Sequence, residues 1–228
     1  SGKNNRAELI GLLLTFYEEA IKKHKPLILH SHFADRGWYD LPIAKKYGLK
    51  YVVSFYGYDV NMLPTKQPVW KDRYKELFDK ADLFLCEWPY MAKCITTLGC
   101  PEEKVNVQRL GVEVDKIPFV HRKVGENGIV KILIAGSFRE KKGIPYALEA
   151  FALTKQKYKN IELTLIGDSG GRIREEEEKN TILNIIEKYN LQDSIKWLGY
   201  QPHHIFLEKL KEHHIFLSPS ITASDGDT

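Results

Sequence analysis

A short basic loop in the second half of the chain holds the residues best suited to bind an anion. It lies between a predicted strand over 130–135 and a predicted helix over 144–158, and reads Gly136-Ser137-Phe138-Arg139-Glu140-Lys141-Lys142-Gly143. Backbone N–H groups at a helix N-terminus attract phosphate. The Arg139 guanidinium suits bidentate contacts to phosphate oxygens, and Lys142 supplies a point charge. The loop therefore predicts a phosphate site, with a solvated basic loop as the alternative; it matches neither a P-loop nor a dinucleotide fingerprint.

A pair of histidines ends the first clear strand of the chain, which starts at Leu27. His30 and His32 are two residues apart, so their imidazoles point to the same side of the strand. One of them could act on a substrate hydroxyl or a pyrophosphate. Hydrogen-bonded histidines that cap the strand are the alternative.

A tyrosine-rich turn follows the next predicted strand, over 51–55. It reads Phe55-Tyr56-Gly57-Tyr58-Asp59. Gly57 permits close approach of the backbone, and Tyr56, Tyr58 and Asp59 would form an aromatic and acidic rim suited to sugar hydroxyls. An ordinary turn between strand and helix is the alternative.

Histidine and cysteine spacing does not indicate a metal site or a disulfide framework. The His203-His204 and His213-His214 pairs suggest a metal site, but adjacent histidines on a helix point apart, and no carboxylate or cysteine is placed to complete a ligand shell. The three cysteines, Cys86, Cys94 and Cys100, form no Cys-x-x-Cys pair. We therefore expect reduced thiols, as in a cytosol, and no metal.

The elements that position these residues alternate between strand and helix on both sides of a linker. Strands are predicted from Leu27 to His32 and over 51–55, 83–86 and 105–107, then over 130–135, 161–166, 195–198 and 215–218. Helices are predicted over 4–25, 41–47, 70–80, 89–98, 144–158, 172–189 and 202–212. Such alternation is typical of parallel α/β sheets. We expect part of one domain over 1–115, a linker over 116–128 and the first part of a second domain over 129–228.

Composition narrows the functional classes. The 228 residues are 43% hydrophobic and 28% charged, which excludes a disordered chain. A net charge of +4 does not suggest a nucleic-acid binder, but it fits a protein that binds anionic small molecules or touches an acidic membrane. The longest apolar run, Leu9–Tyr17, is too short to span a bilayer. The helix that contains it would pack Leu12, Leu13 and Phe16 on the first sheet, or touch lipid weakly through its basic end.

The last residues of the chain form a loop just past a predicted strand. Ligands of open α/β sheets bind beyond the carboxyl ends of the strands, so this loop, with Asp225, is expected to line a binding cleft. Each half has four predicted strands and neither sheet looks finished. We therefore expect the chain to be a fragment.

Several short motifs occur in an order that resembles the GT-B glycosyltransferases of family 4. His-Ser-His-Phe-Ala, Ser-Phe-Tyr-Gly-Tyr-Asp-Val and Leu-Gly-Val-Glu-Val resemble their acceptor domain. Gly-Ser-Phe-Arg-Glu-Lys-Lys-Gly, Leu-Ile-Gly-Asp, Trp-Leu-Gly-Tyr and Ser-Pro-Ser resemble their donor domain. The resemblance runs from about His30 to Thr228, and is greatest to enzymes that build exopolysaccharide, colanic-acid-like or lipopolysaccharide chains.

The resemblance implies two Rossmann-like domains and a retaining transfer of a sugar from a nucleotide-sugar to a glycan or lipid-linked acceptor, with no cofactor and no essential metal. Lys142 matches the family's phosphate-binding lysine. Ser137 stands where the family often has arginine, so Arg139 becomes the substitute. Tyr56 stands where the family has its active-site histidine, which leaves Tyr56 and His32 as catalytic candidates. Gly57, Asp59, Gly136, Ser137 and Asp225 would line the donor and acceptor cleft.

The resemblance also sets expectations for activity and location. The family's Glu-x7-Glu element would begin just after Thr228, so we expect this polypeptide to lack turnover. A nucleotide-sugar epimerase, a glycan phosphorylase and a non-catalytic nucleotide- or sugar-binding module are the alternatives within the same fold, and a purely structural α/β protein is the alternative outside it. The implied donor is made in the cytosol, so we expect a cytoplasmic protein with at most weak, salt-sensitive contact with the inner face of a membrane and no nucleic-acid partner.

Overall fold

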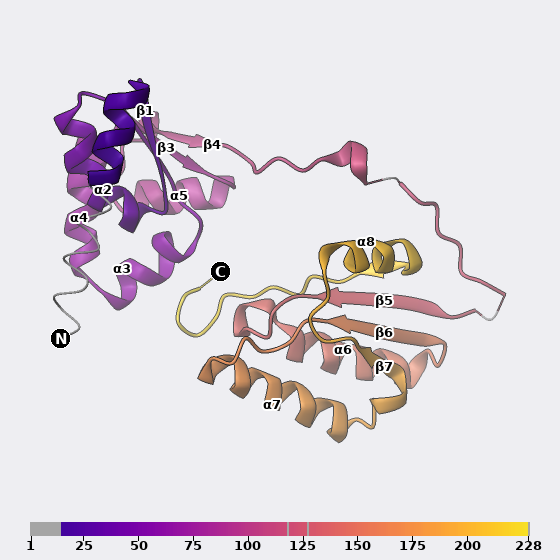
Figure 1. The fold of residues 1–228 in the computed structure, drawn as a ribbon. Coiled ribbons are helices and arrows are strands. Elements are labelled where there is room, and N and C mark those ends of the chain that lie inside the picture. The colour runs from indigo at the N-terminus through magenta and orange to yellow at the C-terminus, as the bar shows by residue number, and fades with distance from the viewer. Residues whose placement is uncertain (1–14, 118, 127, 228) are drawn as a thin grey trace. The chain divides into compact units, whose positions relative to one another are not determined.

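A computed structural model describes residues 15–117, 119–126 and 128–227 of the chain. The fold divides into two compact units (Figure 1). The first comprises residues 1–111 with 225–227, and the second comprises residues 112–224 with 228. Each unit is described by itself below.

The first unit contains, among the described residues, a four-stranded parallel sheet in the order β1-β2-β3-β4. The strands are β1 (Ile28–His32), β2 (Lys50–Ser54), β3 (Leu83–Cys86) and β4 (Val105–Val107). The helices that connect them are α2 (Ala34–Lys46), α3 (Leu63–Lys66), α4 (Val69–Lys80) and α5 (Pro89–Thr97), and residues 15–24 form a further helix. The predicted strands and their parallel pairing are confirmed.

Three features of this unit differ from the sequence predictions. α2 begins at Ala34 rather than near Leu41. The stretch expected to be irregular holds a turn of π-helix, η1 (Tyr58–Met62), followed by α3. Phe16 is 66% exposed rather than packed on the sheet, and among the described residues 15–24 of its helix the buried one is Ile21. The predicted start of that helix, with Leu12 and Leu13, lies outside the described residues.

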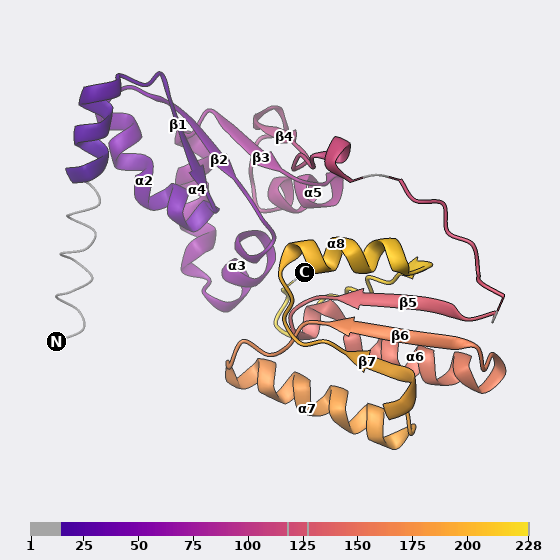
Figure 2. The same ribbon diagram turned by 45° about the vertical axis from the view of Figure 1, so that its right-hand side comes forward.

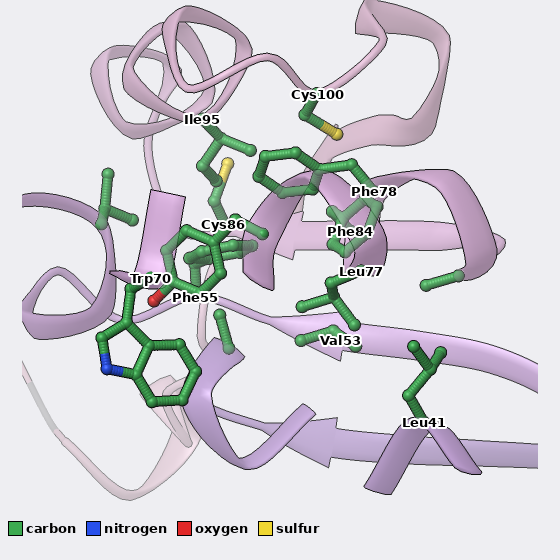
Figure 3. Close-up of a cluster of buried hydrophobic side chains, with 14 of the residues drawn as sticks. Leu41, Val53, Phe55, Trp70, Leu77, Phe78, Phe84, Cys86, Ile95 and Cys100 are labelled. Atoms are coloured by element: carbon green, nitrogen blue, oxygen red, sulfur yellow. The ribbon is translucent and has the colours of Figure 1, made fainter. Parts of the chain in front are cut away.

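Aromatic side chains dominate the core of the first unit (Figure 3). Phe55, Phe78 and Phe84 contact one another, with ring centroids 5.2 to 6.3 Å apart. Each of these rings is at most 2% exposed, and burial of one such side chain stabilises a fold by about 1.5–3 kcal/mol. Phe55 directly follows β2, so the core anchors the tyrosine-rich turn at the end of that strand.

The second unit contains, among the described residues, a four-stranded parallel sheet in the order β7-β6-β5-β8. The strands are β5 (Val130–Ala135), β6 (Ile161–Ile166), β7 (Ile195–Trp197) and β8 (Ile215–Phe216). Helices α6 (Ile144–Lys157) and α7 (Ile173–Lys188) lie on one side of the sheet, and α8 (His203–Glu212) lies on the other (Figure 2). The predicted α/β class, with two parallel sheets and flanking helices, is confirmed.

The strand order creates a topological switch point in the second sheet. The chain runs outward from β5 through β6 to β7, then returns to place β8 on the other side of β5. Connections on the two sides of β5 therefore diverge, and open α/β sheets bind ligands at such a point. Within the described residues, no helix is long and apolar enough to cross a membrane.

Candidate functional site

Two loops meet at the switch point of the second sheet. One follows β5 over 136–143, and the other follows β8 over 217–224. The N–H of Ile221 donates to the carbonyl of Lys141 at 2.9 Å. The N–H and hydroxyl of Ser224 donate to the two carboxylate oxygens of Glu140, at 2.8 and 2.7 Å. Glu140 therefore joins two segments that are 84 residues apart in the sequence.

The side chain of Phe138 anchors the basic loop over 136–143. This side chain is fully buried, and its ring lies 5.5 Å from the Trp197 ring. The N–H of Phe138 donates to the carbonyl of Asp168 at 3.0 Å, and the N–H of Gly136 donates to the carbonyl of Ile166 at 2.9 Å. The loop is thus bonded to the end of β6 as well as to β5, which fixes the backbone that carries the cations.

Close backbone approach explains a glycine at the end of the loop. A Cβ on Gly143 would lie 2.0 Å from the carbonyl oxygen of Pro219, and its φ of +61° lies in the left-handed region. Gly143 immediately precedes α6, so only a residue without a side chain lets the loop after β8 pass against this helix start.

The predicted phosphate-binding residues lie together on this loop. Gly136, Ser137, Arg139 and Lys142 are all half-buried, with Lys142 at the end of a short 3₁₀ helix, η4 (Glu140–Lys142). The aliphatic stem of Lys142 lies against Gly136, since a Cβ on that glycine would be 3.6 Å from the lysine Cγ. Among the described residues, the Lys142 ammonium has neither a hydrogen-bond acceptor nor a carboxylate within ion-pair distance, so its charge is available to an anion.

Acidic groups flank this cationic edge. Burial raises the pKa of the Glu178 carboxyl, and the nearby charge of Glu140 raises it further. Asp168 is bonded to Lys179, whose Nζ lies 2.8 Å from Oδ1. Although partial burial alone would raise the pKa of Asp168, this ion pair and the N–H of Ser169 lower it overall. Asp168 is therefore occupied by protein partners.

In the first unit, the two catalytic candidates form a hydrogen-bonded pair. His32 Nδ1 lies 2.5 Å from the hydroxyl oxygen of Tyr56, and their rings stack with centroids 5.8 Å apart. His30 is bonded instead to the Ser54 hydroxyl at 2.8 Å, and burial, followed by the proximity of His32, lowers the pKa of its imidazole. The His32–Tyr56 pair lies at the carboxyl ends of β1 and β2 and is open to solvent.

The predicted role of Asp59 as part of a sugar-binding rim is wrong. Asp59 is fully buried, and its carboxylate oxygens accept the N–H groups of Ala34 and Tyr56 at 2.8 and 2.9 Å. Its side chain therefore holds the two loop backbones rather than facing a ligand. Gly57 precedes η1 with a φ of +100°, and it is buried as well. Of the predicted rim, Tyr56 and Tyr58 remain partly exposed.

Other residues that the sequence analysis names have protein partners in the described part of the chain, and the expected cleft position of Asp225 stays a prediction. Asp225 groups with the first unit, where its carboxylate lies 2.9 Å from Lys66 Nζ. His213 is buried and bonded to the Thr164 hydroxyl and the Lys209 carbonyl, and His214 accepts the N–H of Lys131. No group of three or more His, Cys, Asp or Glu side chains converges among the described residues in a way that could hold a metal.

The sequence predictions overlooked two residues of the site. Glu140 had no predicted role because its partner, Ser224, is distant in the sequence. Gly167 is predicted only as part of the Leu-Ile-Gly-Asp motif of the resemblance, whereas a Cβ there would lie 1.8 Å from the carbonyl oxygen of Gly136. The sequence signal for both is their position after strands of the second sheet: Gly167 directly follows β6, and Glu140 lies in the loop after β5.

Two family models together match almost the whole chain. The model described as Glycosyltransferase Family 4 matches residues 4–116, and the model described as Glycosyl transferases group 1 matches residues 115–226. The boundary between the two matches lies close to the boundary between the two compact units.

Curated relatives support the same assignment. The chain is 33% identical to the amylovoran biosynthesis glycosyltransferase AmsK of Erwinia amylovora over 178 residues. It is 30% identical over 179 residues to WcaL of Salmonella typhimurium, a protein named for colanic acid biosynthesis. Each alignment covers 78% of this chain and 42% of the relative, so the chain spans about two fifths of their length.

Solved structures share the fold at low sequence identity. The chain superimposes on sucrose-phosphate synthase from Thermosynechococcus elongatus with a TM-score of 0.74, at 16% identity over 93% of this chain and 55% of that one. It superimposes on HepE of Anabaena, solved in complex with UDP, with a TM-score of 0.73, at 12% identity over 95% of this chain and 57% of that one.

Proposed function

Because the chain belongs to the glycosyltransferases, with a family 4 segment followed by a group 1 segment, we propose that it serves a retaining transfer of a sugar from a nucleoside-diphosphate sugar. The acceptor is a hydroxyl of a glycan or lipid-linked glycan in surface polysaccharide biosynthesis. The names of the curated relatives support the polysaccharide pathway. The structures of HepE with UDP and with UDP-glucose support the donor class.

The observation that carries the proposal is the cationic loop at the switch point of the second sheet. Arg139 and Lys142 lie there on a backbone that Glu140 and Phe138 fix in place. A donor diphosphate would bring negative charge to this edge, and the leaving nucleoside diphosphate needs that charge stabilised as the bond to the sugar breaks. In our proposal the two cations supply this stabilisation without a metal ion.

The His32–Tyr56 pair supports an acceptor-side role for the first unit. The imidazole and the phenol hold each other in a fixed orientation through the 2.5 Å bond at Nδ1. That bond leaves Nε2 as the imidazole nitrogen that faces a ligand. Nε2 can either donate a hydrogen bond to a sugar hydroxyl or accept one from it. We assign Tyr56 and His32 to hydroxyl positioning near the reacting bond.

Titration of this chain with UDP tests the donor site. Each charge-assisted contact is worth about 1.5–3 kcal/mol, so Lys142→Ala and Arg139→Ala should each weaken UDP binding about tenfold or more. Lys157→Ala is the matched control, because Lys157 lies at the opposite end of α6. Unchanged affinity in both loop variants would reject the assignment.

The proposed donor would place the reaction in the cytosol, with weak peripheral attachment to an anionic membrane. The helix over 15–24 supports such a contact, because Phe16 is exposed near its start and Lys22, Lys23 and Lys25 are exposed around its end. Each cation near an anionic surface contributes about 1 kcal/mol. Flotation with vesicles that contain phosphatidylglycerol should show attachment at low salt that disappears at high salt. Attachment that survives high salt would contradict the proposal.

A further inference from the structure

We infer that the carboxyl edge of the first sheet is a platform of aromatic rings that binds at least two linked sugar rings of a glycan acceptor, one of them on the indole of Trp88. The inference rests on the proposed function and specifies the acceptor as an oligosaccharide rather than a single sugar. It concerns residues of the first unit alone.

The exposure of Trp88 is the first observation. Its side chain is 54% exposed, whereas Trp70 is 4% exposed. The indole N–H groups of the other three tryptophans donate to Glu76, Gln67 and the Gly167 carbonyl. Within the described part of the chain, the Trp88 indole N–H has no acceptor. A large apolar ring with an unused donor, placed in solvent, is suited to a ligand that has both apolar and hydroxyl surfaces.

Arg109 holds this indole from the next strand end. Its guanidinium carbon lies 5.1 Å from the centroid of the Trp88 ring, a cation–π distance. Trp88 follows β3 by two residues, Arg109 follows β4 by two residues, and the strand ends are joined because the N–H of Gln108 donates to the Cys86 carbonyl at 2.8 Å. No carboxylate pairs with Arg109 among the described residues, so its N–H groups can bond ligand hydroxyls.

A second group of rings lies at the ends of β1 and β2. The Phe33 ring lies 4.9 Å from the Tyr56 ring, which also stacks on His32. Phe33 is 44% exposed. Backbone bonds align these strand ends with β3, since the N–H of Phe33 donates to the Ser54 carbonyl and the N–H of Phe55 donates to the Leu85 carbonyl, each at 2.9 Å.

The spacing of the strands sets the length of the ligand. Neighbouring strands lie about 4.8 Å apart, so the ends of β2 and β3, which Tyr56 and Trp88 follow, are separated by about 5 Å. This spacing is the size of one sugar ring, so two linked pyranose rings can lie one on the Tyr56 group and the next on Trp88. Tyr90, which is 73% exposed at the start of α5, extends the same edge.

A carbohydrate fits this edge better than a single-stranded nucleic acid does. Nucleic-acid grooves combine stacking rings with a row of cations that follows the phosphate backbone. Here the cation in contact with the Trp88 ring is Arg109, and the polar groups of the second group of rings are the His32 imidazole and the Tyr56 hydroxyl. Such groups bond neutral hydroxyls, while the ring faces pack on the C–H surface of a sugar.

Titration with sugars of increasing length tests the platform. The probes are glucose and the β-1,4-linked series from cellobiose to cellotetraose, with the matching β-1,3-linked series in parallel, followed by tryptophan fluorescence and backbone amide NMR shifts. In at least one series, affinity should rise about tenfold between the single sugar and the tetrasaccharide, because only the longer ligand covers Trp88 and the Tyr56 group together; tenfold corresponds to about 1.4 kcal/mol. Trp88→Ala should lose this gain and Trp88→Phe should keep most of it.

Tyr158→Ala is the matched control, because Tyr158 is a 56% exposed ring with its own cation, Lys157, at 5.2 Å, and lies at the end of α6 in the second unit. It should bind sugars like the wild type. The inference is overturned if neither series shows a gain with length, if Trp88→Ala keeps the gain, or if oligo(dT) binds more tightly than the tetrasaccharides. UDP titration of the same variants separates this inference from the proposed donor site. The wild type and all the variants should bind UDP with equal affinity. If the wild type does not bind UDP, the donor site is rejected, but a gain in affinity with sugar length would still support the platform.

Discussion

The carboxylate of Asp59 holds the backbone of Tyr56 in place. Its Oδ1 accepts the Tyr56 N–H at 2.9 Å, while Oδ2 accepts the N–H of Ala34 at 2.8 Å. The hydroxyl of Tyr74 donates to the Asp59 carbonyl at 2.7 Å. Asp59 thus connects the segments that follow β1 and β2, which carry the His32–Tyr56 pair, and its substitution should change both stability and the geometry of that pair.

Replacing Asp59 with Asn should remove a pH dependence of stability. Burial, with a smaller contribution from the charge of Asp35, raises the pKa of Asp59 from 3.8 to about 6. The folded chain therefore binds the proton more tightly than the unfolded chain, and stability from this group is full below about pH 4 and is lost as the pH rises through 6. Relative to Asp59→Asn, the wild type should lose up to about 3 kcal/mol between pH 4 and pH 7.

Urea unfolding at several pH values, followed by tryptophan fluorescence, measures this difference. Three of the four tryptophans, Trp38, Trp70 and Trp88, lie in the first unit, so the signal reports mainly on that unit. A difference between wild type and variant that stays constant from pH 4 to pH 7 would contradict the assignment of the pKa to Asp59.

A single methyl group at Gly167 should destabilise the second unit severely. Its φ of +133° is strained for any L side chain, and the added Cβ would lie 1.8 Å from the Gly136 carbonyl oxygen, which belongs to backbone that cannot rotate away. We expect Gly167→Ala to cost more than about 3 kcal/mol. Gly171→Ala is the control: its φ is +82° with nothing within 4 Å of the Cβ, so only backbone strain of about 1 kcal/mol applies. Thermal unfolding that is equal for the two variants would refute the close approach.

The sequence predicted the parts of the fold that depend on local pattern. The apolar run Val130–Ala135 and the periodic stretch of α4 were assigned correctly because hydrophobic spacing alone specifies them. Local pattern does not predict that Asp59 is buried, because one of the two N–H groups that its carboxylate accepts comes from Ala34, 25 residues away. The Glu140–Ser224 contact was unpredictable for the same reason, since it depends on β8 lying beside β5.

Arg73 should contribute to stability through two aromatic rings. Its guanidinium carbon lies 4.4 Å from the Trp38 centroid and 4.6 Å from the Trp70 centroid, so it joins α2 to α4. Partly desolvated cation–π contacts are worth about 0.5–2 kcal/mol each. Arg73→Ala should therefore lower the free energy of unfolding by about 1–3 kcal/mol. Arg73→Lys should restore only part of it, because an ammonium lacks the planar group that stacks.

Lys75→Ala on the same helix is the control, since Lys75 is exposed and pairs only with Asp72 among the described residues, one turn away. It should change stability by less than about 0.5 kcal/mol. If urea unfolding shows the Arg73 and Lys75 variants to be equally stable, the two ring contacts do not stabilise the fold.

Glu140→Gln should lower the pKa of Glu178 and weaken UDP binding. The charge of Glu140 raises the pKa of the Glu178 carboxyl, after the larger effect of burial, so a neutral amide at position 140 removes that repulsion. The amide also accepts only one of the two hydrogen bonds from Ser224, which loosens the loop that carries Lys142. Carboxyl-carbon NMR titration follows the pKa, and Glu208→Gln on the exposed face of α8 is the charge-matched control. Glu140 is itself an anion beside the proposed phosphate site, so its neutralisation would strengthen UDP binding if its charge alone mattered. Weaker UDP binding together with a lowered Glu178 pKa would show that Glu140 acts by holding the loop.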